Sequence, residues 1–341
     1  MKKSKLLYLL PGLAFLSCSD ETLTDPQTIE EHTELIEANV EVAYPDEIGK
    51  ISTVFFAGKE ISIEEIDGEY IYEGDIKLSP EMLSRKEPKL VYEPGEKAPE
   101  KSVGRTSGYW PNNTVYYAID ANLSDKARVT DAIKHWESNT NLKFVLRSSQ
   151  SNYIYFTPGS GCSSYIGMIG GRQNITLASS CSTGSTIHEI GHAVGLWHEQ
   201  SRVDRNKHVQ ILYDNIQSGR EHNFKTYAES GYDGKEFTSS LDFGSIMMYG
   251  PYSFSSNGKP TIVKANGSTY TVQRSALSSG DIQGANSMYP STTTVAPTYI
   301  NGKSYILYGV TVYRYNDTWL YYSRNLGWKE VVLRSGYWYY K

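Results

Sequence analysis

The stretch HEIGHAVGLWHE, at His188–Glu199, decides what the rest of the chain must support. His188 and His192 are four residues apart, so on an α-helix of about 3.6 residues per turn both imidazoles leave the same face, one turn apart. Two imidazoles in this arrangement can bind one Zn²⁺ ion. Glu189 is rotated off the ligand positions but stays near the metal, where it can take a proton from a water molecule. The stretch therefore predicts a zinc-binding helix that carries its own base.

A third histidine follows the helix and predicts where the helix ends. His198 comes six residues after His192, and six helical steps carry a side chain to the far side of a helix. The helix must therefore stop between the two. Gly195 lies where the stop is needed, because glycine enters the left-handed conformation at little cost. The turn then returns His198 to the metal as a third ligand.

The complete motif H-E-x-x-H-x-x-G-x-x-H resembles that of the metzincin zinc peptidases, which also have a methionine turn, here Ser245–Gly250 (SIMMYG). Glu199 directly after the third histidine and the following Ser201–Arg205 (SRVDR) narrow the resemblance to the astacin family. It covers roughly residues 107–290. The resemblance implies an α+β fold, in which a twisted N-terminal β-sheet and two long helices lie above a cleft and an irregular C-terminal half lies below it.

The resemblance also implies a chemistry, namely hydrolysis of peptide bonds with one Zn²⁺ per chain on the three histidines of the motif. Glu189 takes a proton and later gives it to the leaving amine. Tyr249 is a fifth zinc ligand at rest and stabilises the oxyanion of the transition state, while Met247 forms an apolar floor below the metal. The alternative is a surface adhesin or binding protein that keeps a structural metal site. That alternative predicts loss of the base or the tyrosine, and both are present.

An acidic segment precedes the zinc motif. Residues 19–105 contain 22 acidic and nine basic side chains, whereas the chain after residue 105 contains 16 acidic and 21 basic ones. This imbalance favours a prosegment that docks on a peptidase domain at 106–290, although a solvated acidic spacer gives the same count. Tyr72–Ile76 (YEGDI) resembles the F-x-G-D-I motif of astacin propeptides, with tyrosine in place of phenylalanine. The resemblance implies that Asp75 is the zinc ligand that keeps the precursor latent; a turn between two strands is the alternative.

The segment Lys97–Arg105 resembles an exposed activation loop, with basic residues among small and polar ones. We expect activating cleavage within about residues 96–107 by a protease that the sequence does not identify. In the family the new N-terminus folds inward and reaches the glutamate after the third histidine. The resemblance therefore implies that Glu199 receives the mature N-terminus and tethers it beside the active site.

The beginning of the chain has the pattern of an export signal. Three lysines within the first five residues precede the apolar run Leu6–Leu16, which is too short to span a membrane. Phe15–Cys18 (FLSC) resembles a bacterial lipobox. The sequence therefore predicts a signal at residues 1–18 and lipidation of Cys18, which would anchor the protein in the outer membrane at the bacterial cell surface. An ordinary cleaved signal and an extracellular product are the alternative.

Two further cysteines, Cys162 and Cys181, lie within the peptidase domain. In an exported protein two cysteines of one domain most simply pair, and this pair also matches one of the two astacin disulfides. The strand around Ile175 resembles the edge strand of the cleft, where the substrate backbone adds as an extra strand. Protein or peptide substrates are therefore expected, but the sequence does not identify their preferred side chains.

The C-terminal part lies outside the resemblance. Residues 291–297 have the composition of a linker, and residues 298–341 alternate polar residues with tyrosine and tryptophan. This pattern predicts a small β unit of three or four strands. Its aromatic residues either form a small core or bind a surface or a glycan. The chain has no basic cluster interleaved with aromatic residues, so we expect no nucleic-acid partner.

Overall fold

The computed structural model describes residues 40–56, 59–80, 83–84, 91–92, 108–230, 235–291, 299–307, 310–334 and 337–341. The predicted signal with Cys18, the activation segment 97–105 and linker residues 292–297 lie outside the described residues. Among the described helices, none combines the length and apolar character needed to cross a membrane.

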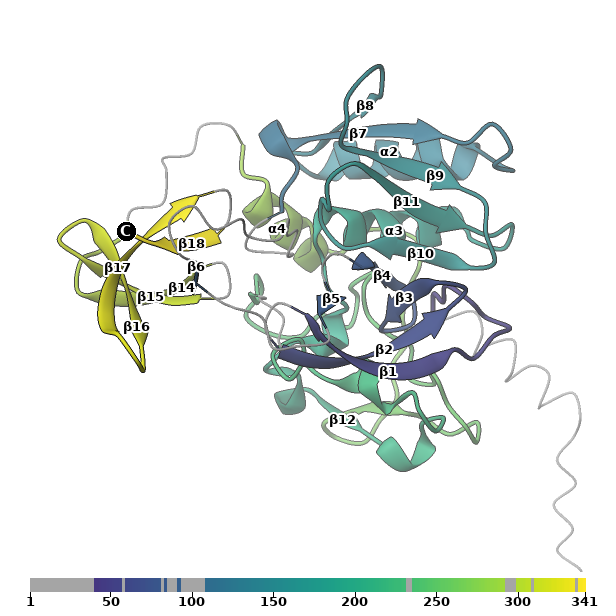
Figure 1. The fold of residues 1–341 in the computed structure, drawn as a ribbon. Coiled ribbons are helices and arrows are strands. Elements are labelled where there is room, and N and C mark those ends of the chain that lie inside the picture. Colours follow the sequence, from purple (N-terminus) through teal and green to yellow (C-terminus); the bar gives the residue numbers. More distant parts are fainter. Residues whose placement is uncertain are drawn as a thin grey trace, which may run out of the picture.

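A ten-stranded sheet joins the prosegment to the peptidase part of the chain (Figure 1). The strand order is β5-β1-β2-β3-β4-β10-β11-β9-β7-β8. The first five strands lie before residue 106, in the segment that the sequence analysis expects to be a prosegment and that is called the prosegment below. They are β1 (Lys50–Phe56), β2 (Lys59–Ile66), β3 (Glu69–Tyr72), β4 (Ile76–Leu78) and β5 (Leu83–Ser84). The other five belong to the peptidase part: β7 (Thr114–Ile119), β8 (Lys143–Leu146), β9 (Tyr153–Thr157), β10 (Cys162–Tyr165) and β11 (Arg172–Leu177). The prosegment is therefore part of the same sheet as the peptidase unit.

In the described part of the chain, three α-helices accompany this sheet: α2 (Ala127–Asn139), α3 (Thr183–Val194) and α4 (Ser279–Met288). Helix α2 buries Val129, Ala132 and Trp136, which recur at the spacing of one helical face. The indole Nε1 of Trp136 donates to the carbonyl of Ile187 on α3 at 3.1 Å, so the two helices are joined by a hydrogen bond as well as by packing. The core of the peptidase part lies between these helices and strands β7–β11.

The half below α3 is irregular, as predicted for an α+β fold of this kind. Its described residues form one two-stranded antiparallel sheet, β12 (Val209–Ile211) with β13 (Ile262–Lys264). Short 3₁₀ turns make up much of the rest: η3 (Glu199–Ser201), η4 (Arg205–Lys207), η5 (Tyr213–Asn215) and η6 (Glu221–Phe224). Another, η2 (Pro111–Asn113), precedes β7.

The prediction that the strand around Ile175 forms the edge of the cleft is wrong by one position in the sheet. Ile175 lies on β11, which is flanked by β9 and β10 on its two sides. The outermost of the five peptidase strands on this side of the sheet is β10. Prosegment strand β4 pairs with β10 in parallel, with Ser164 opposite Ile76. Strand β10 is short and contains two serines, so it lacks the apolar alternation by which a strand is recognised in a sequence.

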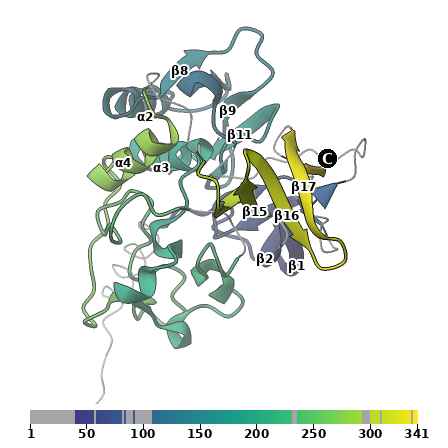
Figure 2. The same cartoon turned by 90° about the vertical axis from the view of Figure 1, so that its left-hand side faces the viewer.

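The C-terminal part forms a second sheet, separate from the first (Figure 2). Its own strands are β14 (Lys303–Leu307), β15 (Val310–Tyr315), β16 (Thr318–Ser323), β17 (Gly327–Arg334) and β18 (Tyr337–Tyr340). The described residues thus form five strands where three or four were predicted. A sixth strand completes this sheet and was not predicted. It is β6 (Val91–Tyr92) of the prosegment, which pairs in parallel with β18. A small core of Val310, Val312, Val331 and Trp338 lies within this sheet.

Candidate metal centre

Helix α3 has defined signals at both ends. At its start the hydroxyl of Ser182 accepts the backbone N–H of Ser185 at 3.0 Å, which satisfies one of the free donors of the first turn. At its end Gly195 has φ 111°, in the left-handed region, and its N–H donates to the carbonyl of His192 at 2.8 Å. The prediction that the helix stops at Gly195 is therefore confirmed.

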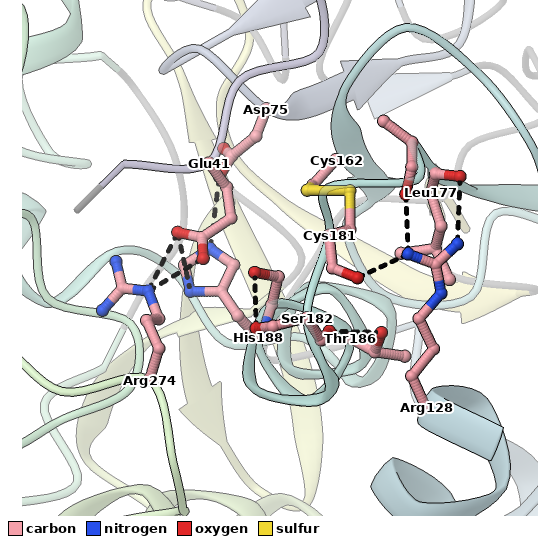
Figure 3. The surroundings of a disulfide bond; sticks show 12 residues. Glu41, Asp75, Arg128, Cys162, Leu177, Cys181, Ser182, Thr186, His188 and Arg274 are labelled. Atoms are coloured by element: carbon pink, nitrogen blue, oxygen red, sulfur yellow. Dashed lines mark hydrogen bonds and ion pairs between the residues drawn. A yellow bond between two sulfur atoms is a disulfide. The ribbon is translucent and has the colours of Figure 1, made fainter. Parts of the chain in front are cut away.

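The N-terminus of α3 is anchored from two sides (Figure 3). The predicted disulfide is confirmed, because Cys162 on β10 is bonded to Cys181 just before the helix, 19 residues away. Closing a loop of this length stabilises the fold by about 3 kcal/mol in the chain-entropy description. On the other side the buried guanidinium of Arg128 on α2 donates to the carbonyls of Cys181 and of Ala178, the latter at 2.6 Å. Sequence reasoning gave no role to Arg128.

Two of the three predicted zinc histidines are oriented by backbone carbonyls of the peptidase part. The Nδ1 atom of His188 lies 2.8 Å from the carbonyl of Ile246, and that of His192 lies 2.8 Å from the carbonyl of Leu196. A carbonyl oxygen only accepts, so each Nδ1 carries a hydrogen. The lone pair of each ring is therefore on Nε2, the atom that faces the site.

The third histidine is oriented by the prosegment. The Nδ1 atom of His198 lies 2.8 Å from the Oε2 atom of Glu73, whose side chain is fully buried. Burial alone would lower the pKa of His198, but the carboxylates of Asp75 and Glu73 outweigh it and raise the pKa to about 9. The same negative field favours a divalent cation at this place. The backbone carbonyl of Glu73 also accepts the Tyr249 hydroxyl at 2.5 Å.

Asp75 completes the set of ligand atoms. Its Oδ2 atom lies 3.2 Å from Nε2 of His188 and 3.3 Å from Nε2 of His198, and its Oδ1 atom lies 3.7 Å from Nε2 of His192. Burial alone would raise the pKa of Asp75, but the imidazoles around it hold this pKa well below its usual range. The four ligand atoms all lie within 4.8 Å of one another, and all four side chains are buried.

This geometry fits a zinc ion. Ligand atoms about 2.0–2.1 Å from a tetrahedral metal lie about 3.3 Å from one another, close to the two shortest carboxylate–imidazole distances. Among the described residues, Nε2 of His192 and Oδ1 of Asp75 have no hydrogen-bond partner although both are buried. Buried polar atoms without partners are rare in proteins, and a metal ligand has no need of one. Three imidazoles and one carboxylate are therefore a donor set that Zn²⁺ prefers.

Glu189 lies beside this set and is fully buried. Neither of its carboxylate oxygens has a hydrogen-bond partner among the described residues. Burial, reinforced by the negative charges of Asp75 and Glu41, raises the pKa of Glu189 well above its usual range. A carboxyl group in this environment can accept a proton and hold it, which is what a general base that later acts as an acid must do.

The methionine turn packs against α3 below the ligands. A side chain at Gly191 would place its Cβ atom 2.6 Å from the sulfur of Met247, so glycine at this position lets the methionine approach the helix. The turn is held by Asp281 of α4, whose carboxylate accepts the Ser245 hydroxyl at 2.6 Å and the Ile246 N–H at 2.9 Å. The buried Met247 therefore packs against α3 at Gly191.

Glu199 faces a small pocket beside the metal centre. The pocket is lined mainly by residues 195–199 just after α3, Met247 of the methionine turn, the start of α4 and residues 235–238. One carboxylate oxygen of Glu199 accepts the N–H of Asp242 at 2.9 Å and lies 3.6 Å from the guanidinium of Arg202. Burial raises the pKa of Glu199 to about 8. The Glu199 carboxylate therefore has partners within residues 199–242 of this structure, which the sequence analysis did not anticipate.

The prosegment covers the metal centre with its backbone as well as with Asp75. The Asp75 carbonyl accepts the N–H of Ser164 on β10 at 3.0 Å, and the Val42 carbonyl accepts the N–H of Cys162 at 3.0 Å. A Cβ atom at Gly161 would lie only 1.9 Å from the Val42 carbonyl oxygen, so the close approach of the two backbones requires glycine there. The prosegment thus uses the hydrogen-bonding edge of β10.

Two ion pairs that the sequence analysis missed connect the prosegment to the lower half of the peptidase part. Glu41 receives the guanidinium Nε of Arg274 at 2.8 and 3.0 Å on its two oxygens, next to His188 (Figure 3). Glu64 on β2 is paired with Arg220. Both carboxylates are buried. No local sequence signal marks these pairs, because their partners are 233 and 156 residues apart.

Comparison with known proteins agrees with this site. Residues 102–290 match the family model of the astacin peptidases. Blastula protease 10 of Paracentrotus lividus is 38% identical over 64% of this chain and 38% of its own length. Zinc metalloproteinase nas-4 of Caenorhabditis elegans is 34% identical over 64% of this chain and 68% of its own length. Among solved structures, high choriolytic enzyme 1, a hatching enzyme zinc-protease of Oryzias latipes, superposes with a TM-score of 0.50. It is 28% identical and covers 56% of this chain and 98% of its own.

The helix with its two histidines, the methionine turn and the buried ligand set define a site of the metzincin class. The chain belongs to the astacin family, since the family model matches more than half of it. It spans less than two thirds of the length of blastula protease 10.

Proposed function

We propose that this chain is a zinc-dependent endopeptidase that is made as a latent precursor. Residues 106–290 carry the activity and residues 19–105 block it. The observation that carries the proposal is the buried group of four ligand atoms, three from the peptidase part and one from Asp75. A zinc ion in this group would act as a Lewis acid that polarises a scissile carbonyl and acidifies water.

The chain's own residues supply the rest of the chemistry. Glu189 takes the proton of the attacking water and passes it to the leaving amine. Its lack of any described hydrogen-bond partner leaves both oxygens available for this transfer. Tyr249 is buried against His198, with ring centroids 4.6 Å apart. Once its hydroxyl is released from the carbonyl of Glu73, this phenol donates to the developing oxyanion.

Latency then has three parts in one short segment. Asp75 takes the position among the imidazoles where substrate or water must bind. Glu73 engages the Tyr249 hydroxyl through its backbone carbonyl. Strand β4 and Val42 use the edge of β10, to which an extended substrate segment would add as a strand. Removing the prosegment would free all three, and the expected substrates are proteins and peptides.

The proposal is tested with the purified precursor and a protein substrate. Proteolysis should appear only after cleavage within residues 96–107, disappear on treatment with a zinc chelator and return when zinc is added back. A precursor carrying Glu189→Gln should stay inactive throughout while it still binds one zinc. Activity that resists zinc removal, or that survives in the Glu189→Gln chain, would contradict the proposed mechanism.

We also propose that the chain is exported and that Cys18 is lipidated, which would anchor it in the outer membrane at the bacterial surface. The support is the sequence pattern of residues 1–18, with the lipobox-like Phe15–Cys18. Metabolic labelling with a radioactive fatty acid tests this proposal, with Cys18→Ser as the comparison. Equal labelling of the two chains, or no labelling of either, would favour an extracellular protein.

The C-terminal unit is proposed to bind a surface glycan. Three large aromatic side chains, Tyr315, Tyr322 and Trp328, are more than half exposed, and Trp328 packs edge-on against Tyr322 with ring centroids 5.3 Å apart. Exposed aromatic faces of this kind stack on sugar rings. Retention on polysaccharide columns should fall in a Tyr322→Ala, Trp328→Ala chain. Unchanged retention on every polysaccharide tested would leave these side chains without a glycan role.

A further inference from the structure

Glu73 contacts a proposed zinc ligand from a segment that leaves when the enzyme is activated. Its side chain is fully buried, and its Oε2 atom accepts the Nδ1–H of His198 at 2.8 Å. Its backbone has φ 48°, in the left-handed region, and Gly74 beside it has φ 83°. Two consecutive residues in this region form the tight turn that presents the Glu73 carboxylate and the Asp75 carboxylate to the same site.

The three imidazoles differ in what orients them. His188 and His192 donate to carbonyls of Ile246 and Leu196, which belong to the peptidase part and remain after activation. The donor of His198 goes to a carboxylate of the prosegment, which does not remain. A hydrogen bond from the second ring nitrogen fixes the tautomer and orientation of a metal-bound histidine, and a carboxylate also makes the ring a better donor to the metal.

We propose that Glu73 is a positioning residue of the metal centre, through which the prosegment increases the zinc affinity of the precursor beyond what Asp75 contributes as a ligand. This inference rests on the proposed zinc site. The prosegment then has two roles, because it blocks the site and it also completes the site for metal loading. Zinc is held most tightly in the precursor, and activation removes one ligand and the orienting carboxylate of another.

The contribution of Glu73 is separable from that of Asp75 and of Tyr249. The Tyr249 hydroxyl is bound by the Glu73 backbone carbonyl, which a change of the side chain leaves in place. The Asp75 carboxylate contacts the Nε2 atoms, on the opposite side of the imidazoles from Nδ1. Replacing the Glu73 side chain by alanine therefore removes the hydrogen bond to His198 and leaves in place the contacts of the Glu73 carbonyl and of the Asp75 carboxylate.

The experiment measures zinc affinity, with no readout of activity. Full-length precursors that carry Glu189→Gln, to prevent self-processing, are titrated with zinc in competition with a chromogenic chelator. Glu73→Ala should weaken zinc binding by about 10–100-fold, the usual effect of losing such a partner. Glu73→Gln should restore part of the affinity, because the amide oxygen still accepts the Nδ1–H but carries no charge. Glu60→Gln, an exposed prosegment carboxylate on β2, should bind zinc like the parent.

The outcomes separate this inference from the proposed function. Full affinity in Glu73→Ala, with reduced affinity in Asp75→Ala, would overturn the role of Glu73 and leave the zinc site standing. A parent precursor that binds no zinc would overturn both. Equal losses in Glu73→Ala, Glu73→Gln and Glu60→Gln would point to loosened docking of the prosegment and would also overturn it. Circular dichroism of the zinc-free chains checks their folding, and Glu73→Gln keeps the test decisive if the alanine variant does not fold.

Discussion

Helix α3 and the prosegment segment around Asp75 meet at the same ligand atoms, but they are held there in different ways. The helix has its own caps, and its histidines are oriented by carbonyls that lie four and 58 residues away. The prosegment contacts the same site through residues that are distant in the sequence. Asp75 lies 113 residues from His188, and Glu41 lies 233 residues from its partner Arg274. The helix is therefore fixed largely by its own caps and by residues of the peptidase part. The proposed prosegment is held by contacts to distant residues, which would become reversible after the proposed cleavage.

This difference predicts that substitutions in the helix abolish peptide hydrolysis, whereas substitutions in the prosegment make the uncleaved chain active. The following changes test that separation, beginning with the largest expected effect.

Glu189→Gln should give the largest effect. Glutamine keeps the size of the side chain but cannot accept the proton of the attacking water, so the processed enzyme should lose about 10²–10⁴-fold in rate. Zinc content should stay at one ion per chain, because the three histidines are untouched. Peptide hydrolysis assays measure the loss of rate, and metal analysis of the same sample measures the zinc content. Retention of more than about a tenth of the activity would remove Glu189 from the mechanism.

Asp75→Ala should raise activity, whereas Glu189→Gln lowers it. The precursor loses the carboxylate that lies among the imidazoles, so uncleaved protein should become active or process itself. Breaking a buried charged contact costs about 3–5 kcal/mol, so the blocked arrangement should weaken and the precursor's rate should rise by at least about a hundredfold. Asp46→Ala, at an exposed prosegment position, is the control and should stay latent. A silent Asp75→Ala precursor would mean that the prosegment inhibits by covering the cleft alone.

Glu41→Gln should have a smaller effect on how tightly the prosegment stays bound. The change removes the charge that faces Arg274 but keeps an acceptor, and Arg274 still donates to the Met248 carbonyl at 3.2 Å. We expect the cleaved prosegment to dissociate about tenfold more readily, which corresponds to about 1.4 kcal/mol. Glu47→Gln, at an exposed position of the same segment, is the matched control. Inhibition of processed enzyme by added prosegment measures the affinity, and equal values for the two variants would show that the ion pair does not hold the prosegment.

The same difference explains how much could be predicted from the sequence. The ligands on α3 and the stop at Gly195 follow from helical spacing, and the roles of Met247, Tyr249 and Asp75 came from the family resemblance. The disulfide followed from two cysteines lying in one domain of an exported protein, and the resemblance agreed with it. Strand β10 was missed because its serines give no apolar alternation. The contacts of Glu73 and Glu41 were missed because they join segments 125 and 233 residues apart. Such pairings depend on how the prosegment docks, which spacing in one sequence does not determine.

The pairing of β6 with β18 is a case of the same kind. Val91 and Tyr92 showed no strand pattern of their own, yet they extend the C-terminal sheet. The prosegment therefore contributes strands to both large sheets. Strand β4, next to Asp75, pairs within the ten-stranded sheet, and β6 pairs within the C-terminal sheet. Residues 97–105, where we expect activating cleavage, follow β6 in the chain, so cleavage there would leave β6 with the prosegment.

Glu199→Ala should give the smallest effect, and that effect should depend on the form of the enzyme. Glu199 accepts the Asp242 N–H at 2.9 Å in the precursor, so the change leaves this donor without its partner. That should cost about 1–2 kcal/mol and lower the melting temperature by roughly 2–8 °C. The pocket beside Glu199 offers room for a second partner, the α-ammonium of a mature N-terminus.

If the new N-terminus docks there after cleavage, the processed enzyme loses an ion pair as well, so its melting temperature should fall further than that of the precursor. A buried α-ammonium that loses its carboxylate costs more than a backbone N–H that loses its acceptor. Differential scanning calorimetry of both forms, with zinc content held at one per chain, gives the comparison. Asp204→Ala, which removes another carboxylate bound to Arg202, is the control and should shift the two forms equally. Equal shifts for Glu199→Ala in the two forms would place the mature N-terminus elsewhere.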